Sequence, residues 1–287
     1  MIFNAQSSVR ADGSFDMAGV APGGYYLNVF SMSGQIRNRA RQEVDVGTGD
    51  LDGVVLTLTP PGSIKGVARL EGTPPSNGPQ LSASNLHVGL VPAEMTGMMS
   101  GPANAKFSPD GTFTIENVSP GKFYVQTNAP PGTYLKSIRF GNSEVLGKEL
   151  DLSGGAAGQL ELVYRYGPGE LDGQLESAQN GTTDNGAAAQ IAVVPEQLTA
   201  DGTGIRYATT DPKGNFKTPN LAPGRYRAYA FEEVNYNALQ NPDMLKQLES
   251  KSEVFEVKEN EKKQVQLPLI PRDEVDQLYA RLGIQPQ

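Results

Sequence analysis

Histidine and cysteine, the residues most typical of zinc sites and of activated nucleophiles, are scarce in this chain. The sequence contains one histidine, His87, and no cysteine. A zinc site normally takes several nitrogen or sulfur ligands, and a nucleophilic triad needs a histidine base beside an activated nucleophile. One histidine without any cysteine meets neither requirement. We therefore expect His87 to be an ordinary strand residue, and we predict no catalytic residue, no metal site and no cofactor.

Acidic residues are the next candidates, and they gather in two places. Asp45, Asp50 and Asp52 form one group, and Asp201 with Asp211 forms the other. Calcium takes roughly six to eight oxygen ligands, usually from closely spaced carboxylates, whereas Asp50 and Asp52 supply only a pair. A glycosidase would need two facing carboxylates, and an acidic protein contains such pairs by chance. Neither calcium binding nor glycoside hydrolysis is expected.

Three tyrosines could contact a ligand or another chain. Tyr26, Tyr124 and Tyr134 are predicted to be exposed on strands. Exposed aromatic rings can stack on sugar rings or mediate assembly. Since β-strands are rich in tyrosine, the same residues are equally typical of ordinary strands. Polysaccharide binding and a role in assembly both stay open for them.

A phrase that recurs three times predicts the elements that carry these residues. It begins with Asp-Gly or a close variant, continues to an aromatic residue, and ends in Pro-Gly, one residue and a second aromatic. The copies run from Asp12 to Tyr25, from Asp110 to Phe123, and from Asp211 to Tyr226. Asp-Gly and Pro-Gly are typical of tight turns, and the alternation of apolar and polar residues after each turn indicates strands.

The spacing of the phrase predicts the fold class. Pro22, Pro120 and Pro223 recur at intervals of about 100 residues, a length that suits β-sandwich domains. Glycine occurs 33 times and proline 21 times, and helical patterns are few. We therefore predict an all-β protein of tandem β-sandwiches, the first one incomplete, with a short C-terminal helix.

Four segments are expected along the chain. Residues 1–60 form an incomplete N-terminal sandwich, residues 61–166 the second sandwich, residues 167–271 the third, and residues 272–287 a helix and tail. In the second and third segments an opening strand precedes the phrase by about 40 residues or more, whereas few residues precede Asp12. About three strands are therefore lacking at the front. Either the sequence is a piece of a longer chain, or a partner supplies the rest.

The ends of the segments have recognisable patterns. Val54, Leu56 and Leu58 alternate with polar or small residues and predict a strand that closes the first segment. Short links at 60–62 and 167–169, both rich in proline and glycine, follow the closing strands. Links this short favour a semi-rigid rod of modules.

Two short helices are predicted near the C-terminus. Residues 241–250 begin with Asn241 as a capping residue and Pro242 at the first helical position. A terminal helix is predicted to begin at Asp273 as its cap and to end before Gly283. Its apolar face consists of Val275, Leu278, Tyr279 and Leu282. This face must pack on something, either the third sandwich or a neighbouring chain in a head-to-tail polymer.

The charge of the chain excludes some partners. The net charge is -8 at neutral pH, and the pI is about 4.9. Nucleic acids and anionic membranes both need a basic surface, so neither is expected as a partner. No apolar run approaches the roughly 20 residues of a transmembrane helix, and residues 1–6 do not have the pattern of a signal peptide. Loops at 72–78, 95–105 and 179–185 are candidate binding loops or plain surface insertions.

The three copies of the phrase resemble tandem carboxypeptidase regulatory-like domains, and this resemblance implies tandem seven-stranded transthyretin-like β-sandwiches. The resemblance covers roughly residues 1–271 and rests chiefly on Pro-Gly followed by an aromatic residue. It implies an exported, non-catalytic protein located outside the cell, in the periplasm or at the cell surface. The implied role is that of a structural or scaffold module that assembles with itself or another envelope protein. The alternative role that it implies is an adhesin-like module that binds polysaccharide.

Two features of related families are missing. The zinc-binding set of the peptidase that gave the family its name is absent from the sequence. Collagen-adhesin repeats share this fold and often carry an isopeptide bond between lysine and asparagine. Lys65 lies near the required place, but the strand at 159–164 contains no asparagine. An isopeptide bond is therefore not expected.

Overall fold

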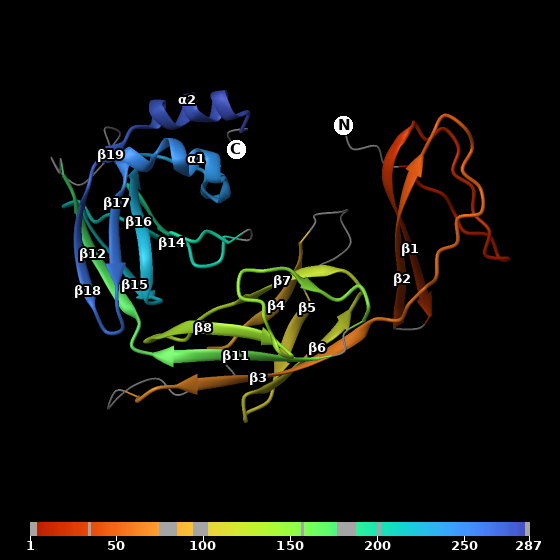
Figure 1. Cartoon of the computed structure of the whole chain (residues 1–287), viewed down its shortest axis with the longest axis horizontal. Helices are drawn as coiled ribbons and strands as arrows, with labels where there is room; N and C mark the ends of the chain where they lie inside the picture. Colours follow the sequence, from red (N-terminus) through yellow and green to blue (C-terminus); the bar gives the residue numbers. More distant parts are fainter. Residues whose placement is uncertain are drawn as a thin grey trace. The chain divides into compact units, whose positions relative to one another are not determined.

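The chain is mainly β-structure, as the sequence predicts. The structure is a computed structural model. Contacts divide the chain into two units: Met1–Gly62 with Asn117–Pro120, and Ser63–Glu116 with Gly121–Gln287. The elements are labelled in Figure 1. The residues that the structure describes are 5–33, 36–74, 85–93, 103–155, 158–176, 188–199 and 202–284.

The first unit contains a single two-stranded sheet. Strand β1 (Gly23–Ser33) pairs antiparallel with β2 (Ile36–Val46) along its whole length. The predicted closing strand through Val54, Leu56 and Leu58 is wrong, because residues 51–58 belong to no strand. In the later repeats the closing strand pairs with an opening strand, and the described part of residues 5–60 contains no counterpart of that strand.

The second repeat forms one continuous curled sheet. Its strands follow the order β10-β7-β4-β5-β6-β3-β11-β8-β9, in which β5 pairs with both β4 and β6 and so joins two layers. Buried side chains such as Ile64, Leu90, Ile115 and Leu160 form its core. In chain order the strands are β3 (Gly62–Glu71), β4 (Val88–Pro92), β5 (Ala103–Phe107), β6 (Thr112–Val118), β7 (Lys122–Thr127), β8 (Thr133–Phe140), β9 (Ser143–Glu144), β10 (Leu150–Asp151) and β11 (Gln159–Tyr166).

The third repeat is a sandwich of two separate sheets. One sheet has the order β15-β12-β18, and the other has the order β14-β13-β16-β17 with β19 beside β16. Leu171, Phe216, Ile191 and Ala228 belong to the buried core shared by the two sheets. In chain order the strands are β12 (Gly169–Leu175), β13 (Gln190–Pro195), β14 (Arg206–Thr209), β15 (Asn215–Leu221), β16 (Gly224–Phe231), β17 (Glu253–Val257), β18 (Lys262–Leu267) and β19 (Leu269–Ile270).

The repeated phrase has the same structural role in both of these repeats. Its first aromatic residue packs directly on a glycine of the opening strand. A Cβ atom placed on Gly66 would lie 2.1 Å from the ring of Phe113, and one placed on Gly173 would lie 2.2 Å from the ring of Phe216. Both rings are almost fully buried. Glycine at these positions therefore gives the aromatic ring the space that it occupies in the core.

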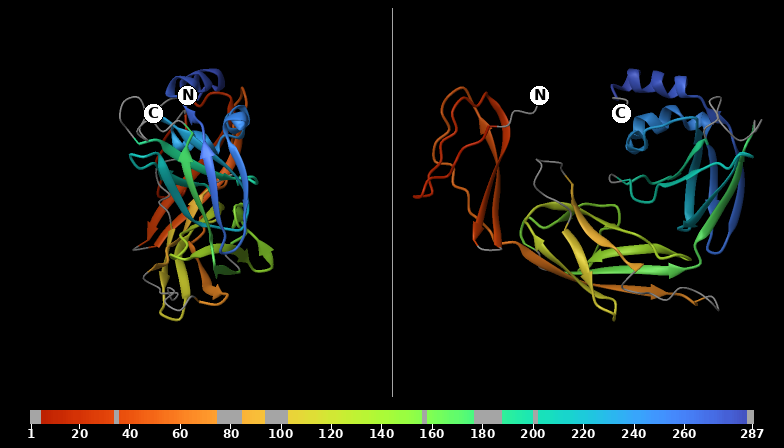
Figure 2. Two further views of the ribbon diagram at one scale, coloured as in Figure 1. Left: turned by 90° about the vertical axis from the view of Figure 1, so that its left-hand side faces the viewer. Right: turned by 180° about the vertical axis from the view of Figure 1, so that it is seen from behind.

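Helical segments cover one sheet of the third repeat. They are η2 (Tyr236–Gln240), α1 (Pro242–Gln247), η3 (Glu249–Lys251) and α2 (Arg272–Leu282). Together with side chains of β13 and β16 they enclose a second apolar core that includes Tyr229, Phe231, Leu248 and Ile270. Figure 2 shows α1 and α2 side by side on the third repeat. The sheet is therefore buried on both faces.

The ends of the two helices test the predicted caps. The side chain of Asn241 accepts a hydrogen bond from the backbone N–H of Asp243, so the predicted cap of the first helix is confirmed. The predicted cap at Asp273 is wrong: Pro271 holds the capping position, and Asp273 lies in the first turn of α2. Gly283 ends the helix in the left-handed conformation, with φ of 66°.

The predicted loops lie largely outside the described residues. This is true of 75–78, 95–102 and 179–185. Residues 103–105, which the sequence assigns to a loop, instead belong to β5.

Candidate functional site: the junction of the second and third repeats

The structure places the predicted contact residues in quite different surroundings. Tyr26 is 42% exposed on β1, and the guanidinium of Arg41 lies 3.9 Å from the centre of its ring. Tyr124 is half-buried on β7. Tyr134 is only 6% exposed, so the prediction that its ring is exposed is wrong. A buried ring offers no surface on which a sugar could stack.

The apolar face of the terminal helix is also covered. Val275 is 1% exposed and Leu278 is 3% exposed, and both belong to the second core of the third repeat. Leu282 packs against the same core. Docking of this face on the third repeat is therefore confirmed. The alternative, in which Val275, Leu278 and Leu282 bind a neighbouring chain, is wrong because the chain itself occupies them.

The acidic candidates within the described residues are exposed or belong to a turn. Asp45, Asp50 and Asp52 are exposed. Asp211 accepts hydrogen bonds from the backbone N–H groups of Lys213 and Asn215, as a turn residue does. Asp201 lies outside the described residues. Within the described ranges, no group of three or more histidine, aspartate or glutamate side chains is placed to hold a metal ion.

His87 takes part in the structure through its backbone. It lies directly before β4, so the prediction that it is a strand residue is wrong, and its N–H donates to Oδ1 of Asn128 at 2.7 Å. Its side chain is exposed.

In the described part of the chain, none of the helices is long and apolar enough to span a membrane.

Buried Tyr134 is part of a contact that the sequence did not reveal. Its hydroxyl donates to Oε1 of Glu259 at 2.8 Å. Arg165 binds both oxygens of the same carboxylate, through Nε at 2.8 Å and Nη2 at 3.2 Å. Tyr134 and Arg165 are neighbours across β8 and β11 of the second repeat, whereas Glu259 lies in the turn between β17 and β18 of the third. One carboxylate therefore joins the two repeats.

The electrostatics of Tyr134 follow from this position. Burial, together with the hydrogen bond to Glu259, raises the pKa of the Tyr134 hydroxyl to about 12. The hydroxyl is consequently a donor at every physiological pH. The raised pKa adds stability below the ordinary tyrosine pKa of about 10, and this stability is lost as the pH rises past about 12.

Backbone groups reinforce the contact. The N–H of Asn260 donates to the carbonyl of Gly167 at 3.0 Å, and the N–H of Glu170 donates to the carbonyl of Glu261 at 2.9 Å. Gly167 has φ of 83°, and the side chain of Asn260 occupies the space that a Cβ atom on this glycine would need. The link at 167–169 is thus bonded to the same turn that carries Glu259. We call Tyr134, Arg165, Gly167, Glu259 and Asn260 the junction clasp.

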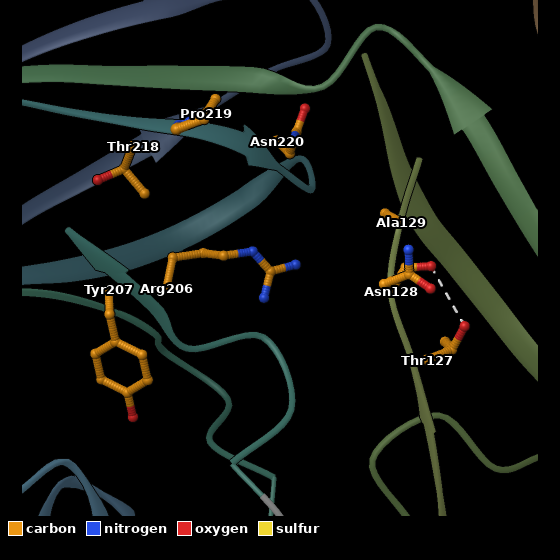
Figure 3. A pocket seen from close by; sticks show the side chains of 8 residues that line it. All are labelled: Thr127, Asn128, Ala129, Arg206, Tyr207, Thr218, Pro219 and Asn220. Atoms are coloured by element: carbon orange, nitrogen blue, oxygen red, sulfur yellow. Dashed lines mark hydrogen bonds between the residues drawn. The ribbon is translucent and has the colours of Figure 1, made fainter. Parts of the chain in front are cut away.

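A second contact lies on the other side of the junction. The N–H of Gly132 donates to Oδ1 of Asn220 at 3.3 Å. Asn220 has φ of 61°, a left-handed conformation that asparagine tolerates better than most residues. Next to it is a pocket of about 350 Å³ between the two repeats, shown in Figure 3. The polar residues that line it include Thr127, Asn128, Arg206, Tyr207, Thr218 and Asn220.

The sequence gives little indication that a charged turn joins the second and third repeats. Lys258 to Lys263 is predicted as a charged turn between strands, and charged turns are normally solvated. The one signal was the link at 167–169, whose brevity predicts limited bending but does not identify the residue that limits it. Long-range pairing between Arg165 and Glu259 has no periodic pattern that a sequence could display.

Comparison with known proteins gives no family for this chain. No family model and no curated protein matches the sequence. Solved structures give distant likenesses. The Bacillus anthracis TIE protein is 17% identical with a TM-score of 0.25, and the match covers 91% of this chain but 48% of that one. The chain thus spans about half the length of that protein.

Two pilins give likenesses of a similar level. GBS52, the minor pilin of Streptococcus agalactiae, is 11% identical with a TM-score of 0.29, over 72% of this chain and 94% of that one. BcpA, the major pilin subunit of Bacillus cereus, is 7% identical with a TM-score of 0.22, over 72% and 98%. TM-scores this low do not establish a shared fold. The resemblance to carboxypeptidase regulatory-like domains therefore stays a prediction.

Proposed function

We propose that this chain is a non-catalytic structural or scaffold protein of the cell surface or envelope, in which β-sandwich modules are held at a fixed spacing. The observation that carries the proposal is the junction clasp. A carboxylate bonded by both an arginine and a buried tyrosine restricts the angle between two modules. Such restriction is useful in a spacer, because the distance between its ends then depends little on thermal bending.

The chemical composition supports the same role. With one histidine and no cysteine, the chain has no thiolate nucleophile and too few histidines for a zinc site built from them. The partners that fit are further copies of this chain or another envelope protein.

The first unit supplies a surface for such assembly. Leu51 is 48% exposed, Val55 is 75% exposed and Leu58 is 41% exposed, in a segment that belongs to no strand. Apolar side chains along an extended segment can be covered by strand addition from a neighbour. Since α2 is packed within its own chain, we place assembly at this segment and not at the terminal helix.

Fractionation of cells that produce the chain tests the proposal. The chain should be recovered with the envelope or extracellular fraction, and protease added to intact cells should release its peptides if it lies on the outer surface. A cytosolic enzyme serves as the control and should remain intact in the same cells. Recovery of the chain with the cytosolic enzyme alone would overturn the proposal.

A further inference from the structure

In the second and third repeats, the opening strand lies in the middle of a sheet. In the third repeat, β12 lies between β15, which follows the turn of the phrase, and β18, which closes the repeat. In the second repeat, β3 lies between β6 and β11 in the same way. The strand after the phrase and the closing strand are therefore joined only through the opening strand between them.

The first unit contains the counterparts of the two outer strands. Residues 14–18 correspond to the start of β6 and β15, and residues 51–58 correspond to β11 and β18. Neither segment belongs to a strand, although each alternates half-buried and exposed side chains as a strand does. Because a strand is defined by hydrogen bonds to a neighbour, both segments lack strand structure where the strand between them is missing.

The apolar face of the first unit is also uncovered. Of the residues between 5 and 62 whose side chains the structure describes, none is buried. Phe15, Leu27 and Leu56 are half-buried, whereas Ile64 and Ile115 in the second repeat are 0% exposed. Since burial of apolar surface is the main favourable contribution to folding and association, a strand that covered this face would be stabilised by it.

The later repeats show which side chains such a strand carries. Gly173 is the direct partner of Phe216 in the pairing of β12 with β15, and a Cβ atom on this glycine would lie 2.2 Å from the ring. Only glycine fits opposite the ring without displacing it. The residues two positions before and after each such glycine are aliphatic and buried: Ile64 and Ala68 around Gly66, and Leu171 and Leu175 around Gly173.

We propose that the first unit binds one strand of a partner chain between residues 14–18 and 51–58, and that this strand carries a glycine opposite Phe15 with an aliphatic residue two positions to either side. The strand pairs antiparallel with 14–18 and parallel with 51–58, as β12 does with β15 and β18. A folded second copy cannot supply it from β3 or β12, because both already have neighbours on each side. The partner is therefore a polypeptide with an unpaired segment of this pattern.

This strand site belongs to the assembly surface at residues 51–58 and so rests on the proposed function. It adds the class of partner, the direction of the bound strand and the residue that selects it. Fractionation tests where the chain is located and does not depend on the binding of a strand. The proposed location and the strand site can therefore fail separately.

Fluorescence anisotropy of a labelled peptide with the purified full chain tests the site. The probe has the sequence of β3, Gly62–Glu71, and its matched control carries Gly66→Val. The chain variants are Phe15→Ala and, as a control, Tyr26→Leu, which removes an exposed ring from the same unit. Hydrogen exchange shows that β1 and β2 remain paired in each variant and locates the bound peptide.

The β3 peptide should bind, and Gly66→Val should weaken binding at least about tenfold, because the added side chain meets the ring of Phe15. In the Phe15→Ala chain the two peptides should differ by about threefold or less, since the smaller residue leaves room for valine. Tyr26→Leu should leave the preference for glycine unchanged. Binding should slow the exchange of backbone amides in 14–18 and 51–58.

Four results would overturn the proposal: no measurable binding, equal affinity of the two peptides, a preference for glycine that survives Phe15→Ala, or slowed exchange confined to other parts of the chain. Chain isolated from its natural cells tests the source of the strand. Slow exchange at 51–58 together with a second polypeptide in the native mass supports a partner strand. A native mass of a single polypeptide overturns it.

Discussion

The first unit and the second repeat contain the same phrase, yet of these two regions only the second repeat places the phrase within a many-stranded sheet. Phe113 is 3% exposed on Gly66 of β3, whereas Phe15 is only half-buried. Strand β11 pairs in parallel with β3, from Gln159 beside Lys65 to Arg165 beside Glu71. The corresponding residues 51–58 of the first unit have the same alternating pattern without forming a strand.

The turns of the phrase are alike in both regions. Oδ1 of Asp12 accepts from the N–H of Ser14 at 3.0 Å, and Oδ1 of Asp110 accepts from the N–H of Thr112 at 3.0 Å. These bonds join residues two positions apart and need no distant partner. A strand, by contrast, is defined by hydrogen bonds to a neighbour. The turn is therefore a local property of the phrase, whereas the sandwich depends on the opening strand.

Replacing a leucine by alanine should give the largest difference in stability between the two regions. Leu160→Ala removes a fully buried side chain from β11 and should lower the free energy of unfolding of the second repeat by about 2–5 kcal/mol. Leu58→Ala, at a position 41% exposed in the first unit, should change stability by less than about 0.5 kcal/mol. Hydrogen exchange of peptides from β3 and β11 measures the first effect. Equal effects of the two substitutions would show that the regions are packed alike.

A glycine substitution tests how the ring of Phe113 packs in the second repeat. Gly66→Ala places a methyl group 2.1 Å from the ring of Phe113 and should destabilise the second repeat by about 1–3 kcal/mol. Gly154→Ala is the control, because a Cβ atom on Gly154 would have no other atom within 4 Å and the substitution should be nearly neutral. Denaturant unfolding compares the two variants.

A second substitution identifies the cause of the loss. Phe113→Leu in the Gly66→Ala background should recover part of the stability, because the smaller side chain makes room for the methyl group. If the double variant is as unstable as the sum of the single variants, the ring is not what requires glycine. The same pair of residues, Gly173 and Phe216, allows the test to be repeated in the third repeat.

A smaller effect is expected at the junction clasp. Arg165 and Glu259 are each more than a third exposed, so their pairing is screened by solvent and should contribute about 1 kcal/mol or less. A double-mutant cycle with Arg165→Gln and Glu259→Gln measures this coupling through hydrogen exchange of the 167–169 link. The exposed pair Lys106 and Glu116 within the second repeat is the control cycle. A coupling no larger than that of the control would remove the special role of Glu259.

The smallest expected effect concerns the turn itself. Hydrogen bonds from Ser14 lower the pKa of Asp12, and hydrogen bonds from Thr112 lower the pKa of Asp110. A lowered pKa adds stability above the unfolded-state pKa, and this stability is lost as the pH falls through the folded-state value. Carboxyl carbon NMR should show both residues titrating below the ordinary range of aspartate. An ordinary pKa for Asp12 beside a lowered one for Asp110 would mean that the turn is not local.

Local patterns accounted for much of the fold. The turns of the phrase, the opening strands through Gly66 and Gly173, and the helix capped by Asn241 all depend on residues close together in sequence. The wrong predictions concern partners that are distant. Alternation along 51–58 indicates which side chains share a face, but it does not show whether a neighbouring strand is present.

The same dependence on distant partners explains why the sequence did not reveal the contacts between the second and third repeats. The sequence around Tyr134 predicts an exposed ring, because it does not show that Glu259, from another repeat, lies beside it. Arg206 and Asn128 meet at the pocket only because the two repeats are placed side by side within one unit. A single sequence does not show which distant residues come into contact, unless a known motif indicates the contact.

If Glu259 holds the second and third repeats together, the distance between the two repeats must be narrowly distributed. The chain has no cysteine, so spin labels on Asn142→Cys and Lys213→Cys, both at exposed turns, report only the separation of the two repeats. We expect one narrow distance distribution in the otherwise unaltered chain and a clearly broader one when Arg165→Gln and Glu259→Gln are added. A distribution that is equally broad in both chains, or equally narrow in both, would show that Glu259 does not fix the junction.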